Sequence, residues 1–257
     1  MQRGLVLLLL AVLAPSAAEA KPKAKAKAKA AAKRKHAARR LVSQKQISHP
    51  DAANDTPAYR YGQMSRQECE AELTKREISF QEEEAKGVAA PVRITGPMHG
   101  VTFRTNQSKA QRDTTPWEIT DCPLALALDD FAVQLAARDI VEVRHYSIYR
   151  PPGKSWPDDK IGIQHIGGNA IDAAIFVKSD GTKLDVLDDF YGHIGDKTCG
   201  DGAGPRKKTD ASTEIRSILC DAVAAHLFNI VLTPNFNRPH RNHFHLEVTG
   251  ASWFMVH

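Results

Sequence analysis

The chain has 257 residues, a formal net charge of +5 at pH 7 and 42% hydrophobic residues, enough for one or two folded domains. Residues 1–40 hold eleven Lys or Arg and one Glu, a net charge of +10, so residues 41–257 sum to −5. The high pI therefore belongs to the N-terminal segment, and nothing in the remaining sequence supports specific nucleic-acid recognition.

The first 20 residues have the features of a secretory signal peptide. Arg3 supplies a positive start, residues 5–13 form an apolar run, and Ala18-Glu19-Ala20 offers small residues for cleavage. The apolar run is too short to span a bilayer comfortably. We therefore expect a mature chain that begins near Lys21, is exported to the periplasm or the medium, and has no transmembrane span.

Residues 21–64 are predicted to be a disordered Lys/Ala-rich tail and linker. Residues 21–40 hold ten Lys or Arg and no acid, so like charges repel and little apolar surface is available for burial. In an exported protein such a tail is placed to contact anionic envelope polymers or lipid headgroups, with a solvated linker as the alternative. Polar residues continue to about residue 64, and a folded domain is expected over residues 65–257.

Four scattered cysteines, Cys69, Cys122, Cys199 and Cys220, form no CxxC pair. Their spacing disfavours a structural zinc site or an iron–sulfur cluster. An even number of cysteines in an exported chain favours disulfides, and three pairings are possible. We favour Cys69–Cys122 with Cys199–Cys220, because each bond would close a loop within one half of the domain.

The first half of the domain predicts two helices and two short strands. Ser65 is a candidate N-cap for a helix over residues 66–76. Short strands are expected over residues 92–95 and 101–104. A broad apolar face predicts a second helix over residues 122–138.

The second half is predicted to be rich in strands, which are expected over residues 140–149, 170–177, 182–187, 229–232 and 244–248. Ser179-Asp180-Gly181 is a turn that would join two of them as a hairpin. One further helix is expected over residues 211–226. Helices followed by strands predict a single α+β domain with a central antiparallel sheet flanked by helices.

Two segments carry the residues suited to chemistry. His165 precedes Asp172 by seven residues, and Asp172 lies in an apolar strand, where a buried carboxylate is costly without a cation or hydrogen bonds. The second segment, His240-Arg-Asn-His243-Phe-His245, leads into the last strand. Strand alternation puts His243 and His245 on one face. If the two strands are neighbours, His165, Asp172 and His245 can converge on one point of the sheet.

Two imidazoles and a carboxylate are typical ligands of a catalytic zinc ion, whose fourth position is left to water. Gly167 and Gly168 would let the backbone turn between His165 and the strand, and they would leave room for a substrate chain. The alternatives are packed or solvent-exposed histidines, a purely structural metal site, and a His cluster that binds metal adventitiously.

The stretch from Tyr146 to Val248 resembles the extensin-like C-terminal family of bacterial proteins, with weaker similarity upstream to Cys69. The residues that carry the resemblance are His165 with Asp172 and the downstream His-x-His motif, together with Gly168-Asn-Ala-Ile-Asp and Thr233-Pro-Asn-Phe-Asn. That family is grouped with zinc peptidases that include D-Ala-D-Ala dipeptidases, L-alanyl-D-glutamate endolysins and penicillin-insensitive murein endopeptidases.

The resemblance implies that His165, Asp172 and His245 bind zinc and that His243 stays beside the metal in the active site. Arg150 matches an arginine of the family and would bind a substrate carboxylate or a developing oxyanion. An ordinary surface arginine is the alternative for Arg150.

Three features depart from the family pattern. Tyr149 stands where the family usually has Cys, and the connection over residues 151–164 is longer and more polar, as expected of a rim or lid. Asn242, three residues before the last predicted ligand, stands where related enzymes often have an acid that serves as general base. If the chain is an active enzyme, His243 or His240 must activate the water instead.

The sequence thus predicts an exported zinc peptidase that hydrolyses peptide bonds of bacterial peptidoglycan, of the D,D-carboxypeptidase or endopeptidase type. Zinc would activate a water molecule, His243 with His240 would transfer protons, and Arg150 would hold the peptide. Asn242 favours the alternative of a non-catalytic zinc-containing protein that binds cell wall. A metal-storage or metal-chaperone protein is a third possibility.

Overall fold

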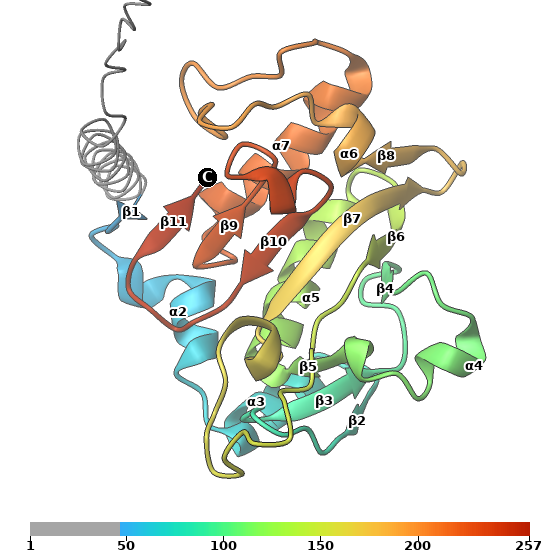
Figure 1. Cartoon of the computed structure of the whole chain (residues 1–257), viewed down its shortest axis with the longest axis vertical. Coiled ribbons are helices and arrows are strands. Elements are labelled where there is room, and N and C mark those ends of the chain that lie inside the picture. Colours follow the sequence, from blue (N-terminus) through green and yellow to red (C-terminus); the bar gives the residue numbers. More distant parts are fainter. Residues whose placement is uncertain (1–46) are drawn as a thin grey trace, which may run out of the picture. The chain divides into compact units, whose positions relative to one another are not determined.

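Two β-sheets and the helices packed against them make up residues 47–257, the part of the chain that this computed structural model describes (Figure 1). The predicted signal peptide of residues 1–20 and the basic tail up to residue 46 lie outside the described residues. Among the described residues, no helix combines the length and the apolar character needed to cross a membrane.

The strands form one large and one small sheet. The large sheet contains β1 (Ile47–Ser48), β4 (Thr102–Arg104), β6 (Ile140–His145), β7 (Ala170–Lys178), β8 (Lys183–Asp185), β9 (Ile230–Leu232), β10 (Phe244–Glu247) and β11 (Phe254–Val256). The small sheet contains β2 (Phe80–Glu82), β3 (Pro91–Ile94) and β5 (Ile119–Asp121).

The α-helices are α2 (Pro57–Gly62), α3 (Arg66–Lys75), α4 (Lys109–Arg112), α5 (Cys122–Ala136), α6 (Val186–Asp189) and α7 (Asp210–Ala224). Short 3₁₀ turns are η1 (Ala53–Asp55), η2 (Pro116–Glu118), η3 (Gln164–Gly167) and η4 (Arg238–His240). The predicted strand over residues 140–149 ends earlier, at His145, and the one over residues 182–187 gives way to α6 after Asp185.

The large sheet runs in the order β1-β11-β9-β10-β7-β6-β4, with β8 paired to β7 as the predicted hairpin. Its central pairs are antiparallel, but β4 pairs with β6 and β11 with β9 in parallel. The sheet is therefore mixed, and the prediction of a central antiparallel sheet is confirmed for its central pairs but not for its edges. Both parallel pairs bring in strands of three residues, too short for periodicity to specify a partner or a direction.

Local sequence signals place the long helices. Ser65 caps α3, because its hydroxyl accepts from the Glu68 N–H while the Glu68 carboxylate accepts from the Ser65 N–H. Helix α5 is buried on most of its surface, and Phe131 meets the rings of Phe176 and Phe228 edge to face. Aromatic packing of this kind joins α5 to the large sheet and to the segment after α7.

Residues 47–64, within the predicted linker, contain β1, η1 and α2. Tyr61 of α2 is buried, its hydroxyl donates to Asp130 of α5, and Arg76 donates to that hydroxyl. These contacts attach α2 to the rest of the domain. Composition gives no sign of this, because one buried tyrosine and its polar partners anchor an otherwise polar segment.

Both favoured disulfides are present. Cys69–Cys122 joins α3 to α5, and Cys199–Cys220 joins the long segment before α7 to that helix. Two disulfides are typical of proteins from oxidising, extracytoplasmic compartments.

A β-bulge interrupts the pairing between β6 and β7. One step along β6, from Arg144 to His145, corresponds to two steps along β7, from Ile175 to Ala173. Strand β7 thus contains one extra residue at this point. An extra residue reverses the alternation of side chains on either side of it. The residues of β7 that face the core are therefore odd-numbered before the bulge and even-numbered after it.

Loss of the Cys69–Cys122 bond should destabilise the fold more than loss of Cys199–Cys220. The two bonds span 53 and 21 residues, for which loop closure predicts stabilisation of about 4 and about 3 kcal/mol. Urea unfolding of the Cys69→Ala/Cys122→Ala and Cys199→Ala/Cys220→Ala double variants measures the two losses. A larger loss for the second variant would show that loop closure does not set their order.

Candidate metal centre

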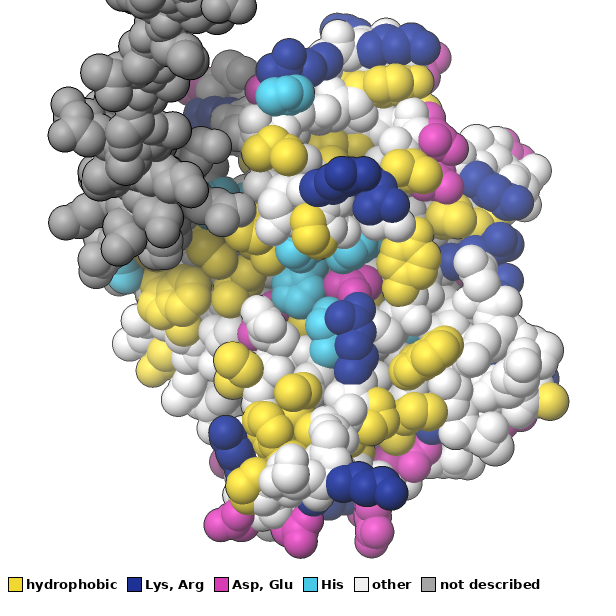
Figure 2. All heavy atoms as spheres, viewed as in Figure 1, with side chains coloured by type: hydrophobic (Ala, Val, Ile, Leu, Met, Phe, Trp, Pro, Cys, Tyr) yellow, Lys and Arg dark blue, Asp and Glu magenta, His cyan; other side chains and the backbone are white. Residues whose placement is uncertain are grey.

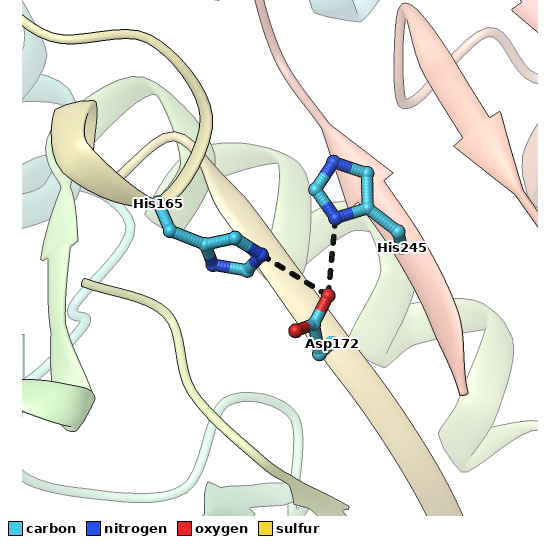
Figure 3. A group of neighbouring side chains, drawn as sticks. All are labelled: His165, Asp172 and His245. Atoms are coloured by element: carbon cyan, nitrogen blue, oxygen red, sulfur yellow. Dashed lines mark hydrogen bonds and ion pairs between the residues drawn. The ribbon is translucent and has the colours of Figure 1, made fainter. Parts of the chain in front are cut away.

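Side chains from two other segments converge on Asp172 of β7 (Figure 3). His165 comes from η3, just before β7, and His245 lies directly opposite Asp172 on the neighbouring strand β10. Asp172 Oδ1 lies 3.2 Å from His165 Nε2 and 3.0 Å from His245 Nδ1. All three side chains are buried, and their potential ligand atoms lie within 4.8 Å of one another. The predicted grouping of these residues is confirmed, as a group that could hold a metal ion.

Strand register and the bulge decide which face carries the group. Residues opposite one another in an antiparallel pair share a face, which brings Asp172 and His245 together. Phe244 and Leu246 are fully buried on the other face, as alternation predicted. Phe176, four residues from Asp172, would share its face in a regular strand, yet it packs in the core against α5 because the bulge intervenes.

A backbone carbonyl fixes the ring of His165. Its Nδ1 donates to the carbonyl oxygen of Ile148 at 2.7 Å. Because a carbonyl only accepts, Nδ1 carries the hydrogen, and Nε2 is left as the nitrogen that faces Asp172. Such a partner behind a histidine ligand orients its ring.

Gly167 and Gly168 are required by the backbone packed around them. Gly168 has a φ of 65°, and a Cβ on it would lie 3.0 Å from the backbone nitrogen of Asp121. A Cβ on Gly167 would lie 2.6 Å from the carbonyl oxygen of Gly162. The predicted sharp turn is thus confirmed. The expectation that these glycines leave room for a substrate chain was wrong, because neighbouring backbone occupies that space.

Glu247 stands behind His245. Its Oε2 lies 3.4 Å from His245 Nε2, on the side of the ring away from Asp172, and the Glu247 side chain is buried. Sequence reasoning missed this residue, although its spacing of two from His245 places it on the same strand face. A carboxylate in this position orients a ligating imidazole and raises its basicity.

The electrostatics of the group favour a bound cation. Burial would raise the pKa of Asp172, but hydrogen bonds from His165, His243 and His245 hold that pKa far below its usual range. Burial would lower the pKa of His245, but its hydrogen bonds with Asp172 and Glu247 outweigh this and raise the pKa to about 9. The centre thus holds an ionised carboxylate and draws positive charge to His245 Nδ1.

Two further histidines lie beside the group. His243 Nε2 is 3.3 Å from Asp172 Oδ1, so a third imidazole faces the same carboxylate oxygen. The His240 ring lies 5.2 Å from the ring of His243 between centroids, and its Nδ1 is 2.7 Å from Asn237 Oδ1. Burial, together with the neighbouring His243 and His245, lowers the pKa of His240 to about 4, so this ring is neutral at pH 7.

Arg150 reaches the centre from its rim. Its Nε donates to Ser147 Oγ at 2.8 Å, and a terminal guanidinium nitrogen contacts Asp172 Oδ2. The side chain is 51% exposed. A guanidinium has five donors, so Arg150 retains some for a bound anion. The catalytic roles of Arg150, His240 and His243 stay predictions.

The long connection after Arg150 leads directly into His165. Tyr149 donates to the carbonyl oxygen of Lys86 at 2.9 Å, and Lys86 Nζ pairs with Asp158 at 2.7 Å. Ile163 near the end of the connection is 73% exposed. Figure 2 shows histidine side chains visible at the middle of this face, beside an acidic side chain and with basic and apolar side chains around them.

Comparison with known protein families gives a match over most of the chain. A family model described as extensin-like protein C-terminus matches residues 67–255, which include the four cysteines and every predicted site residue. No curated protein and no solved structure matches the chain.

Zinc binding at pH 7 should release a proton from His245. With a pKa of about 9, this ring is protonated in the metal-free protein at pH 7, and a metal at Nδ1 displaces that proton. The apparent zinc affinity should therefore rise about tenfold per pH unit between pH 7 and 9 and then level off. Calorimetry in buffers of different ionisation enthalpy counts the protons. An affinity independent of pH, with no proton released, would contradict this assignment.

Proposed function

The chain belongs to the extensin-like C-terminal family, and from this premise we propose that His165, Asp172 and His245 hold a zinc ion and that the domain hydrolyses peptide bonds of bacterial peptidoglycan. The observation that carries the proposal is the convergence of two imidazoles and a carboxylate, buried on one sheet face, with His243 and Arg150 at the edge. Whether the enzyme acts as a D,D-carboxypeptidase or as an endopeptidase depends on how the peptide enters.

The donor set fits zinc. Ligand atoms that share one zinc ion at about 2 Å lie about 3.3 Å apart in a tetrahedral arrangement, close to the 3.2 and 3.0 Å between Asp172 Oδ1 and the two imidazole nitrogens. Neutral imidazoles and a carboxylate suit this ion, and three protein ligands leave one position for water. When bound, zinc would lower the pKa of that water and polarise the scissile carbonyl.

Proton transfer is assigned to His243. Its Nε2 lies beside Asp172 Oδ1, close to the predicted ligands but outside the set of three. We infer that this nitrogen takes a proton from the attacking water and later delivers one to the leaving amine. His240, neutral at pH 7, packs against His243 and supports its orientation.

Arg150 is assigned to the substrate. One guanidinium nitrogen contacts Asp172, and the half-exposed side chain presents its remaining donors at the rim. A guanidinium suits the terminal carboxylate of a wall peptide or the oxyanion that develops on the carbonyl. Peptidoglycan stem peptides carry such carboxylates, which matches this placement.

Export would bring the enzyme to its substrate. The signal-like residues 1–20 and the two disulfides support a periplasmic or extracellular location. Residues 21–40, with ten basic side chains, would bind anionic envelope polymers and hold the domain at the wall.

One observation favours a second candidate, a zinc-containing protein that binds cell wall without catalysis. Asn242, where related enzymes often have a base, cannot take a proton, and its amide is engaged with Tyr146 and His243. This candidate predicts stoichiometric zinc and retention on sacculi without turnover.

Release of soluble muropeptide fragments from purified sacculi tests the proposal. The wild-type chain with zinc should release fragments, whereas chelated wild type and His245→Ala should show almost none, because the metal ligand set is broken. His49→Ala, an exposed histidine outside the centre, should behave as wild type. Equal release by all four samples would rule the hydrolase out, and zinc-dependent retention on sacculi without release would establish the wall-binding candidate.

A further inference from the structure

The segment that joins α6 to α7 runs beside α7, and together they border a cavity of about 510 Å³ (Figure 1). Thr213, Arg216, Ser217 and Cys220 line it from α7, and their spacing of three and four residues puts them on one face of the helix. The other lining residues lie between 198 and 208, and none of the three predicted metal ligands is among them. A cavity of this size is suited to a small organic ligand.

Arg216 is a buried cation at the border of this cavity. The residue is 6% exposed, its Nε donates to the carbonyl oxygen of Phe190 at 3.0 Å, and its guanidinium carbon lies 3.9 Å from the centroid of the Phe190 ring. Both terminal nitrogens are buried and have no hydrogen-bond partner among the described residues. A guanidinium carries five N–H donors, so four of them are left without an acceptor.

The positive charge of Arg216 is only partly compensated. Burial lowers the pKa of its guanidinium, and Asp196, which is paired with Arg206, offsets this effect only in part. Stacking on Phe190 adds a favourable cation–π contact. A guanidinium nevertheless stays protonated at pH 7, and a buried charge whose donors lack partners is costly. An anion that reaches the terminal nitrogens would therefore be bound favourably.

The rest of the border is suited to an anion with an apolar part. Lys208 adds a second positive charge, and none of the lining residues is acidic. Ser217 Oγ accepts from Arg138 at 2.9 Å, so its hydroxyl hydrogen can be donated to a ligand. Pro205 and the Cys199–Cys220 disulfide contribute apolar surface. A free amino acid is disfavoured, because its ammonium group would meet two cations and no acid.

We propose that this cavity is a second ligand site, which binds the terminal carboxylate of a short peptide. The two carboxylate oxygens match the fork of donors that the Arg216 guanidinium presents, and Lys208 and Ser217 complete the contacts. The terminal nitrogens of Arg216 have no hydrogen bonds to give up when the ligand enters. Because these nitrogens are buried, residues 198–208, which include three glycines, must shift to admit the carboxylate.

Amide NMR of the full-length chain tests this site without any need for activity. N-acetylalanine, which has a terminal carboxylate and no ammonium group, should produce shifts in residues 198–220 that saturate. At the same ionic strength, alanine should bind at least about tenfold more weakly, because its ammonium group is repelled by the two cations. Inorganic phosphate should also bind more weakly, because it has no apolar part to contact the wall of the cavity.

Three variants assign the binding to named side chains. Arg216→Lys should weaken N-acetylalanine binding at least about tenfold, because an ammonium cannot make the paired contacts of a guanidinium. Lys208→Glu, at an exposed position where folding should be unaffected, should weaken it about three- to tenfold. Lys75→Glu makes the same charge change on α3, outside the cavity lining, and should stay within about twofold of wild type.

Two results would overturn the proposed site itself. One is the absence of saturable shifts in the wild type, and the other is an affinity for N-acetylalanine that Lys208→Glu leaves unchanged. Tighter binding of phosphate than of N-acetylalanine would overturn the assignment to a carboxylate.

Discussion

The structure depends on how one buried carboxylate is compensated. Asp172 is 2% exposed within an otherwise apolar strand, where an ionised group without partners would cost several kcal/mol. His165, His243 and His245 face one of its oxygens, and Arg150 contacts the other. Because these partners come from different segments, the carboxylate is satisfied only when the segment after β6, the turn η3, β7 and β10 are all in place.

The same arrangement explains why the centre suits a cation. His245 lies between two buried carboxylates, Asp172 at Nδ1 and Glu247 at Nε2, and this pair raises the pKa of the ring to about 9. In the absence of metal, a proton on His245 compensates the negative charge of the two carboxylates. A divalent ion would compensate it better, because it would also bind His165. Glu247 lies behind His245, 3.4 Å from its Nε2.

Much of the framework could be predicted from sequence, because its signals are local. The Ser65 capping box, the apolar face of α5 and the alternation around His245 each need only a few neighbouring residues. The favoured disulfide pairing was correct, although the positions of the four cysteines in the sequence allowed other pairings. The grouping of the three residues followed from placing Asp172 and His245 on adjacent strands, with His165 in the turn before Asp172.

What could not be predicted depends on contacts distant in sequence. No sequence pattern marks the extra residue in β7, yet without it the side chains of Asp172 and Phe176 would point to the same face of the sheet. The parallel edge pairings and the attachment of α2 through Tyr61 likewise arise from tertiary packing. The sequence marks Asn242 as a departure from the family pattern. Its hydrogen bond to Tyr146, 96 residues away, is visible only in three dimensions.

The most direct measurement of the central claim is metal analysis combined with X-ray absorption at the zinc edge, on protein purified without added metal. We expect one zinc ion per chain, coordinated by two imidazole nitrogens and by oxygens from a carboxylate and water, and its loss in Asp172→Ala but not in His49→Ala. Protein without stoichiometric metal, or an unchanged spectrum in Asp172→Ala, would contradict it.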